Sequence, residues 1–303
     1  MSVNVAQLLA RSAHVYPALP ALARGGNVIC TYAELAGRVS RLAAGLARRL
    51  SPNDRVALVM GNCPHYVELL FACWHAGLCA VPIHAKLHPK EFEYILDNSG
   101  ARLCFVTAGL CGAIAPLQAS VARLEEVIDV DGPHYAALAA GAPMAMAPRQ
   151  ADDPAWLFYT SGTTGRPKGV TLTQRNVMAS ILNYFSDVDA IAPGDALIHG
   201  APMSHGSGFY TLPHVAHAGL NVVPESGGFD PAEIYALLQA HRGVTMFAAP
   251  TMVKRLVDFP GDADTANLKT IVYGGGPMYV ADCKAAMARF GYKLAQIYGQ
   301  GES

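Results

Sequence analysis

A run of hydroxyl-bearing residues and glycines at residues 159–170 has the clearest potential for chemistry in this sequence. It reads Tyr-Thr-Ser-Gly-Thr-Thr-Gly-Arg-Pro-Lys-Gly-Val. Glycines allow backbone N–H groups to approach phosphate oxygens closely, and the hydroxyl groups can donate further hydrogen bonds. Lys168 adds a mobile positive charge that suits a polyphosphate. We therefore expect this segment to follow a strand, to precede a helix and to bind phosphate groups.

Two other interpretations bear on residues 159–170. A Walker A loop is excluded, because that pattern, counted from Gly162, requires glycine where this chain has Pro167. A solvated surface loop is the simpler alternative, since Ser, Thr and Gly are ordinary loop residues. Residue types alone leave the phosphate site and the surface loop both open.

Four histidines lie in an uncharged stretch at residues 196–224. A metal site is one hypothesis for them, but no Cys, Asp or Glu joins the group and the spacings match no common metal site. For His199, His214 and His217 we expect hydrogen-bonded histidines of the core or the surface. His205 is the fourth, and its neighbours Ser204 and Gly206 give it a different setting.

Two segments near the end of the sequence also combine glycines with groups that can bind ligands. Residues 270–278 read as a strand that ends in three glycines before a helix, and residues 296–303 read Gln-Ile-Tyr-Gly-Gln-Gly-Glu-Ser. Glycines permit close backbone approach to a flat ligand. A simple tight turn remains the alternative for the first segment.

Alternating helical and strand patterns must position these segments. A capping box at Thr31 and Glu34 begins the first clear helix. We expect further helices at residues 66–75, 89–96, 176–184, 231–240 and 279–289, and strands at residues 55–60, 78–83, 101–107, 155–159, 244–248 and 270–273. Such alternation implies an α/β fold with mostly parallel sheet covered on both faces. We expect two lobes, at residues 1–150 and 151–303, joined by a Gly-, Ala- and Pro-rich connection.

The composition excludes several classes of protein. The 303 residues include 22 Lys plus Arg and 23 Asp plus Glu, so nothing indicates nucleic-acid binding. No run reaches the roughly 20 apolar residues of a membrane-spanning helix, and the N-terminus lacks a secretory signal, so we expect a cytoplasmic protein. The seven cysteines are scattered without metal or disulfide spacing, and we interpret them as small buried residues. Charged residues make up only 15%, against about 25% on average, which indicates either that much of the chain is buried or that a surface is covered by a partner.

The stretch at residues 159–170 resembles the phosphate-loop signature of the adenylate-forming superfamily, which includes acyl-CoA synthetases, aryl-CoA ligases, luciferase and peptide-synthetase adenylation domains. Residues 31–35, 54–58 and 229–252 also contain landmarks similar to those of the family. The resemblance implies the large N-terminal domain of that family, with two mostly parallel sheets flanked by helices. It also implies a two-step reaction, in which ATP and a carboxylate give an acyl-adenylate and pyrophosphate, and coenzyme A then takes the acyl group.

The resemblance also implies a set of site residues. His205 would lie beside the acyl-acid and the adenylate, and Glu302 would help to hold Mg²⁺, as suits a carboxylate. Together with Lys168 they are the candidate catalytic residues. The candidate nucleotide-binding residues are Thr160, Ser161, Gly162, Thr163, Thr164, Gly165, Lys168, Gly274, Gly275, Gly276, Pro277, Gln296, Tyr298, Gly299 and Gly301.

The sequence departs from the family pattern at three positions. Gly301 replaces the usual Thr, which puts one contact to the α-phosphate in doubt. Gly276 replaces the usual Ala and would widen the acyl pocket slightly. Gln174 stands where the family often has His, with no functional consequence that we can infer.

The matching family members continue beyond the segment that corresponds to residues 296–303, with a ribose-binding acid, a hinge and a mobile C-terminal domain. We therefore expect this chain to bind ATP weakly, to turn over poorly and to have that C-terminal domain as its natural partner. A homodimer is also possible. The expected small molecules are ATP, Mg²⁺, coenzyme A and a carboxylic acid.

Two further functions remain alternatives. A peptide-synthetase adenylation domain would carry an Asp for the amino group in the segment that contains His205, and this chain has none there. A truncated, non-catalytic nucleotide-binding protein is kept open by Gly301. The apolar run around Phe209, Tyr210 and Leu212 favours an aromatic, alicyclic or fatty acid over acetate, while the acid itself stays unidentified.

Overall fold

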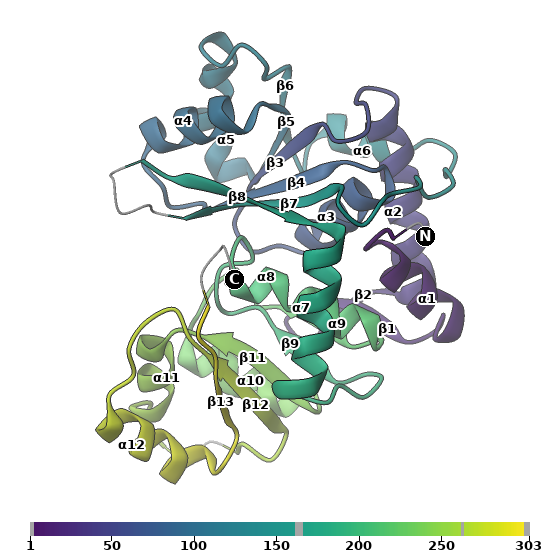
Figure 1. Cartoon of the computed structure of the whole chain (residues 1–303). Helices are drawn as coiled ribbons and strands as arrows, with labels where there is room; N and C mark the ends of the chain where they lie inside the picture. Colours follow the sequence, from purple (N-terminus) through teal and green to yellow (C-terminus); the bar gives the residue numbers. More distant parts are fainter. Residues whose placement is uncertain (1–2, 161–165, 262–263, 300–303) are drawn as a thin grey trace.

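The computed structural model describes residues 3–160, 166–261 and 264–299, and two β-sheets form its framework. In Figure 1 the six-stranded sheet lies in the upper part of the view, and strands β9 to β13 of the seven-stranded sheet lie in the lower part. The predicted α/β fold with two mostly parallel sheets flanked by helices is confirmed. Within the described ranges, no helix combines the length and the apolar character that a membrane crossing requires.

The six-stranded sheet has the order β6-β5-β3-β4-β7-β8, and all its pairs are parallel except β7 with β8. Its strands are β3 (Arg55–Val59), β4 (Cys79–Ile83), β5 (Ala101–Val106), β6 (Glu126–Asp129), β7 (Pro154–Thr160) and β8 (Lys168–Thr173). Along β3, Val56 and Leu58 pack into one hydrophobic core and Ala57 and Val59 into another. The strand is a continuous apolar run because both of its faces are buried.

Helices cover both faces of this sheet. One face packs against α2 (Tyr32–Ala47), α3 (His65–His75) and α6 (Pro133–Ala139). The other face packs against α4 (Pro89–Ser99) and α5 (Ala108–Ile114), which continues into a short 3-10 helix (Ala115–Ala119). The predicted capping box of α2 is present, since Thr31 and Glu34 each bond to the other's backbone N–H.

The seven-stranded sheet has the order β13-β12-β11-β9-β10-β1-β2 and is parallel except for the β1–β2 hairpin. Its strands are β1 (Pro20–Arg24), β2 (Asn27–Thr31), β9 (Ala196–Ile198), β10 (Leu220–Val223), β11 (Val244–Ala248), β12 (Leu268–Tyr273) and β13 (Leu294–Gln296). One face packs against α10 (Pro231–Ala240), α11 (Pro250–Val257) and α12 (Val280–Phe290). Figure 1 shows α7 (Gln174–Asp187), α8 (Gly206–Phe209) and α9 (Thr211–Ala216) on the side toward the other sheet, and α1 (Gln7–Val15) contacts α2 and α9.

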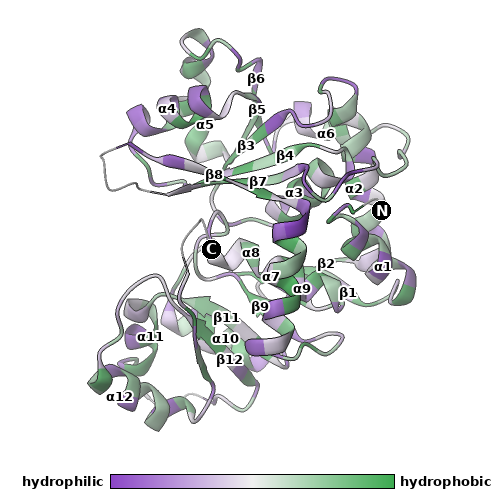
Figure 2. Cartoon of the chain, in the orientation of Figure 1, coloured by the Kyte–Doolittle hydropathy of each residue, from purple (hydrophilic) through white to green (hydrophobic). Residues whose placement is uncertain are grey.

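Each sheet takes strands from both sides of residue 150. Strands β1 and β2 join β9 to β13, whereas β7 and β8 join β3 to β6. The predicted lobes at residues 1–150 and 151–303 therefore do not coincide with the two sheets, and whether they behave as separate units stays a prediction. Figure 2 shows hydrophobic strands inside the molecule and hydrophilic residues mainly on the outer helices and loops.

The strand and the helix expected before and after the segment at residues 159–170 are present as β7 and α7. Strand β8, which pairs antiparallel with β7 before α7 begins at Gln174, was not predicted. Strand β8 pairs with the strand that precedes it in the chain, and it is only partly buried. Its sequence therefore lacks the strong apolar pattern of the buried strands.

Candidate functional site

Strands β4 and β7 are parallel neighbours, with Ala80 paired to Trp156, so their carboxyl ends lie at the same edge of the sheet. His84 follows the end of β4, and Thr160 is the last residue of β7. In open α/β sheets, ligands bind in the crevice beyond the carboxyl ends of the strands. We therefore expect a ligand site at this edge of the sheet.

The candidate phosphate loop connects β7 to β8 at this edge. Thr160 pairs with Lys168 across the hairpin, so Lys168 lies at the base of the loop, and its side chain is exposed. The predicted residues Ser161, Gly162, Thr163, Thr164 and Gly165 lie outside the described residues. Arg166 lies between these residues and Lys168 in the chain, and its guanidinium is 5.6 Å from the centre of the Tyr94 ring.

His205 lies at the same edge, directly before α8. Its ring centre is 5.3 Å from that of Phe158 on β7 and 5.4 Å from that of His84. The Oγ of Ser204 lies 2.9 Å from Nδ1 of His205. Burial, and then the nearby His84, lower the pKa of His205 to about 4, so the imidazole is neutral at pH 7.

Two contacts hold the segment around His205 in place. Asn62, which follows β3, donates from Nδ2 to the carbonyls of His199 (2.8 Å) and Ala201 (2.9 Å) and accepts from the N–H of Met203 at 2.8 Å. Gly206 lies against the ring of Phe247 on β11, and a Cβ at residue 206 would come within 3.1 Å of that ring. Helix α8 can approach β11 this closely only because residue 206 has no side chain.

The other histidines of residues 196–224 are in the core or are hydrogen-bonded, as predicted. His199 is fully buried and lies 2.9 Å from Ser207 Oγ and 3.1 Å from Asn221 Oδ1. Nδ1 of His214 lies 2.9 Å from the carbonyl of Tyr210, and Nδ1 of His217 lies 3.0 Å from the carbonyl of Ile191. Among the described residues, no group of three or more His, Cys, Asp or Glu is arranged to hold a metal ion.

The predicted glycine turn follows the end of β12. Gly274 is buried, and a Cβ there would lie 2.8 Å from the Cγ1 and the carbonyl oxygen of Ile297. Gly275 has a φ of +79°, while Gly276 and Pro277 are exposed. The turn after β12 and the segment after β13 therefore lie in contact, as the parallel pairing of the two strands requires.

Of the residues predicted in the final segment, three lie beside this turn or follow it. Gln296 pairs with Tyr273, and Tyr298 and Gly299 are exposed. Tyr298 is 88% exposed, which leaves its ring accessible to a flat ligand. Gly301 and Glu302 lie outside the described residues.

Strand β11 and the start of α11 connect the two groups of candidate residues. Phe247 contacts Gly206, next to His205, and Pro250 lies 3.9 Å from a Cβ placed on Gly276. Figure 1 shows α8 between the two sheets. The fold thus places the candidate acyl histidine and the candidate adenine turn on the two sides of a region between the sheets.

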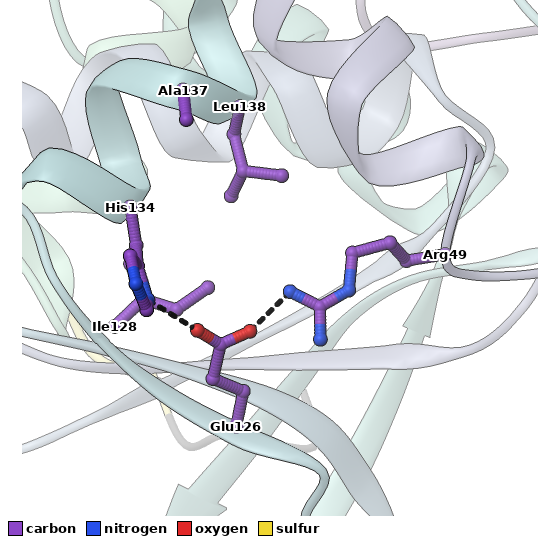
Figure 3. A pocket seen from close by; sticks show the side chains of 6 residues that line it. All are labelled: Arg49, Glu126, Ile128, His134, Ala137 and Leu138. Atoms are coloured by element: carbon purple, nitrogen blue, oxygen red, sulfur yellow. Dashed lines mark hydrogen bonds and ion pairs between the residues drawn. The ribbon is translucent and has the colours of Figure 1, made fainter.

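Two cavities lie elsewhere, at the amino ends of the strands in the six-stranded sheet. One of about 230 Å³ lies between Arg49, Glu126 and His134. Figure 3 shows the Glu126 carboxylate between the Arg49 guanidinium and the His134 ring. Burial alone would raise the pKa of Glu126, but hydrogen bonds from Arg49 and His134 lower it. This ion pair ties α2 and α6 to β6, at the edge opposite the candidate site.

The second cavity, of about 320 Å³, includes Arg55, Cys79 and Pro154, which are the first residues of β3, β4 and β7. Its lining also includes Tyr159 and Gly169, which belong to the segment at residues 159–170. Neither cavity holds a candidate catalytic or nucleotide-binding residue.

The motif search missed two residues of this edge, His84 and Asn62. Each belongs to no recognised pattern of residue types. A signal was available, because each comes within three residues of the end of a predicted parallel strand, where side chains meet at a ligand crevice.

Comparisons with known proteins identify the family of this chain. A model of the AMP-binding enzyme family matches residues 9–303. The feruloyl-CoA synthase of an Amycolatopsis species is 35% identical over 298 residues, which are 97% of this chain but 58% of that protein. The chain thus spans little more than half of that relative.

Two solved structures are similar over almost the whole chain. The inhibitor-bound N-terminal domain of FACL13 from Mycobacterium tuberculosis has a TM-score of 0.86 and 26% identity, and covers 99% of this chain and 76% of that chain. ATP-bound MatB from Rhodopseudomonas palustris has a TM-score of 0.86 and 27% identity, and covers 99% of this chain and 60% of that chain.

Proposed function

Because this chain belongs to the AMP-binding enzyme family, we propose that it is the nucleotide- and acyl-binding part of a ligase that activates a carboxylic acid with ATP and passes the acyl group to coenzyme A. The position of His205 carries the proposal. Its half-buried ring contacts Phe158, two residues before the end of the strand that leads into the candidate phosphate loop. An acid beside His205 and a phosphate beside Thr160 would therefore be neighbours.

The first half-reaction brings two anions together, the carboxylate and the α-phosphate of ATP. The protein must therefore align them and stabilise the charge that develops on the phosphate oxygens. Thr160, Lys168 and the hydroxyl and glycine residues between them would hold the β- and γ-phosphates and the leaving pyrophosphate. Mg²⁺ would neutralise part of this charge, and Glu302 is the carboxylate that suits it.

A neutral His205 fits the first half-reaction. The pKa of about 4 leaves the imidazole uncharged at pH 7, so it can donate or accept one hydrogen bond without forming an ion pair with the acid. An ion pair would bind the ground-state carboxylate tightly and would lower its reactivity as a nucleophile. His205 would instead orient the acyl group.

The adenine would lie against the other side of the region, at the turn of Gly274 to Pro277. Gly274 contacts Ile297, and the next residue in the chain is Tyr298, whose side chain is exposed. Gln296 and Gly299 flank the same ring in the sequence. A purine stacked on Tyr298 would then direct its ribose and phosphates toward the phosphate loop.

We propose an aromatic acid as the substrate class. Phe158 lies against His205, and Phe209 lies against Trp156 at 5.5 Å between ring centres. Tyr210 and Phe247 form a second aromatic pair at 5.7 Å beside Gly206. The feruloyl-CoA synthase at 35% identity makes ferulate the first acid to test.

Isothermal calorimetry with ATP and Mg²⁺, followed by ferulate, tests the proposal on this chain. We expect saturable ATP binding, and ferulate binding that is tighter than acetate binding, because the aromatic side chains bury the ring. A chain that binds neither ATP nor any acid would be the non-catalytic remnant that the sequence left open, and the proposal would fail.

A further inference from the structure

Two histidines from distant parts of the chain meet at the candidate site. His84 follows β4 and His205 precedes α8, and their ring centres lie 5.4 Å apart with an angle of 81° between the planes. His84 is half-buried, and the family resemblance assigns it no role. No local sequence pattern predicts this contact, because the two histidines lie 121 positions apart in the chain.

Hydrogen bonds fix the proton of the neutral His84 ring. Its Nδ1 accepts from the backbone N–H of Lys86 at 3.2 Å. A neutral imidazole carries one proton, so the proton of His84 lies on Nε2, which becomes a donor. The same assignment applies to His205 when the Ser204 hydroxyl donates to its Nδ1.

Neither Nε2 atom has a hydrogen-bond partner in residues 3–160, 166–261 or 264–299. The third ring of the group, Phe158, offers no acceptor. Both histidines are half-buried and neither Nε2 atom is fully buried, so a ligand can reach these two groups. The two rings meet edge to face beside the apolar ring of Phe158, and their N–H groups can serve an oxygen atom of a bound ligand.

We propose that His84 is a second acyl-binding histidine, which donates from Nε2 to the acyl carbonyl oxygen of the adenylate that His205 also contacts. This inference rests on the proposed function and adds a residue to it. A carbonyl oxygen has two lone pairs and can accept from both rings at once. His84 would thereby orient the acyl group and would make the affinity for the adenylate depend on its acyl half.

The test compares two inert ligands, 5′-O-(N-feruloylsulfamoyl)adenosine and 5′-O-sulfamoyladenosine, of which only the first has an acyl carbonyl. We measure their dissociation constants for the unmodified chain and for His84→Phe, which keeps a ring but loses the donor. We expect His84→Phe to weaken the feruloyl ligand about tenfold, the effect of one lost hydrogen bond to a buried group, and to leave the second ligand unchanged.

Two further variants complete the experiment. His84→Gln keeps an N–H donor and should restore the feruloyl affinity to within about threefold. His14→Phe replaces an exposed histidine on α1 and should change neither ligand. Thermal unfolding of each variant is recorded, and His84→Leu, which also lacks the donor, replaces His84→Phe if that variant does not fold.

The outcomes separate the two proposals. If the unmodified chain binds neither ligand, the proposed function fails. If it binds both and His84→Phe binds the feruloyl ligand equally well, the role of His84 is overturned. An equal loss for both ligands, or a failure of His84→Gln to restore binding, also overturns it, because the effect would then come from ring packing.

Discussion

Lys168 is the first residue of β8 and pairs with Thr160 across the hairpin, so the backbone fixes its position at the base of the candidate phosphate loop. Its amine is exposed and can reach a phosphate. A charge-assisted hydrogen bond contributes about 1.5–3 kcal/mol. We expect Lys168→Met to weaken ATP binding about tenfold or more in calorimetry, whereas Lys90→Met on α4 should have no effect. Equal ATP affinities for the two variants would contradict the assignment.

Asn62 holds the segment between β9 and α8, which contains His205. Its amide makes three hydrogen bonds to backbone groups between His199 and Met203. Asn62→Asp keeps the oxygen that accepts from Met203 but replaces the donating amide group with a second carboxylate oxygen. That oxygen faces the carbonyl oxygens of His199 and Ala201, so acceptors face each other without a proton between them. We expect a loss of about 2 kcal/mol in the free energy of unfolding, measured in urea, and weaker binding of the feruloyl ligand. Asn62→Asp with unchanged stability would show that this contact does not hold the segment.

At the level of elements, the glycine turn after β12 offers a matched pair of changes. A Cβ on Gly274 would overlap Ile297, with both Cγ1 and the carbonyl oxygen at 2.8 Å, whereas a Cβ on Gly276 would lie 3.9 Å from Pro250. Gly274→Ala should therefore cost about 1–3 kcal/mol and weaken nucleotide binding, because the backbone after β13 must move. Gly276→Ala should leave stability within about 0.5 kcal/mol.

Urea unfolding and ATP titration of both variants check this prediction. Equal effects of the two changes would mean that the turn and the segment after β13 are not packed as described.

The elements that the sequence predicted well have local signals. Helix α10 and strand β11 begin and end where their apolar patterns do, and Asp230 caps α10 through the N–H of Glu233. The β1–β2 hairpin and β8 were not predicted, since both are edge elements with partly exposed residues and gain their stability from pairing. Local patterns carry little information about such pairing.

Only those candidate site residues that belong to a recognisable sequence motif could be predicted from the sequence. His205 and the turn of Gly274 to Pro277 belong to recognisable segments, and the structure brings both to the region between the sheets. His84 and Asn62 are single residues whose role depends on which strands are neighbours. That neighbour relation is a property of the sheet order and not of the nearby sequence.

For the whole molecule, buried histidines predict a loss of stability in acid. Burial lowers the pKa of His199 and of His214 to about 4, against 6.5 for an ordinary histidine. Between these values the unfolded chain binds more protons than the folded chain, so this contribution is complete above pH 6.5 and is lost as the pH falls. We expect the free energy of unfolding to fall by about 1.4 kcal/mol per pH unit for each buried histidine as the pH is lowered from 6 to 4.5.

Urea unfolding at several pH values checks this slope, and His214→Gln should reduce it by the share of one histidine. A free energy of unfolding that does not change with pH in this range would contradict the buried, neutral state of these side chains.

The central claim is that one region between the two sheets holds both an adenosine and an acyl group. Direct titration of the chain with 5′-O-(N-feruloylsulfamoyl)adenosine, beside sulfamoyladenosine and ferulate alone, tests it. We expect the joined ligand to bind at least about a hundredfold more tightly than either half, because the second group binds without a further loss of translational freedom. Joined and separate ligands of equal affinity, or no binding by any of them, would contradict it.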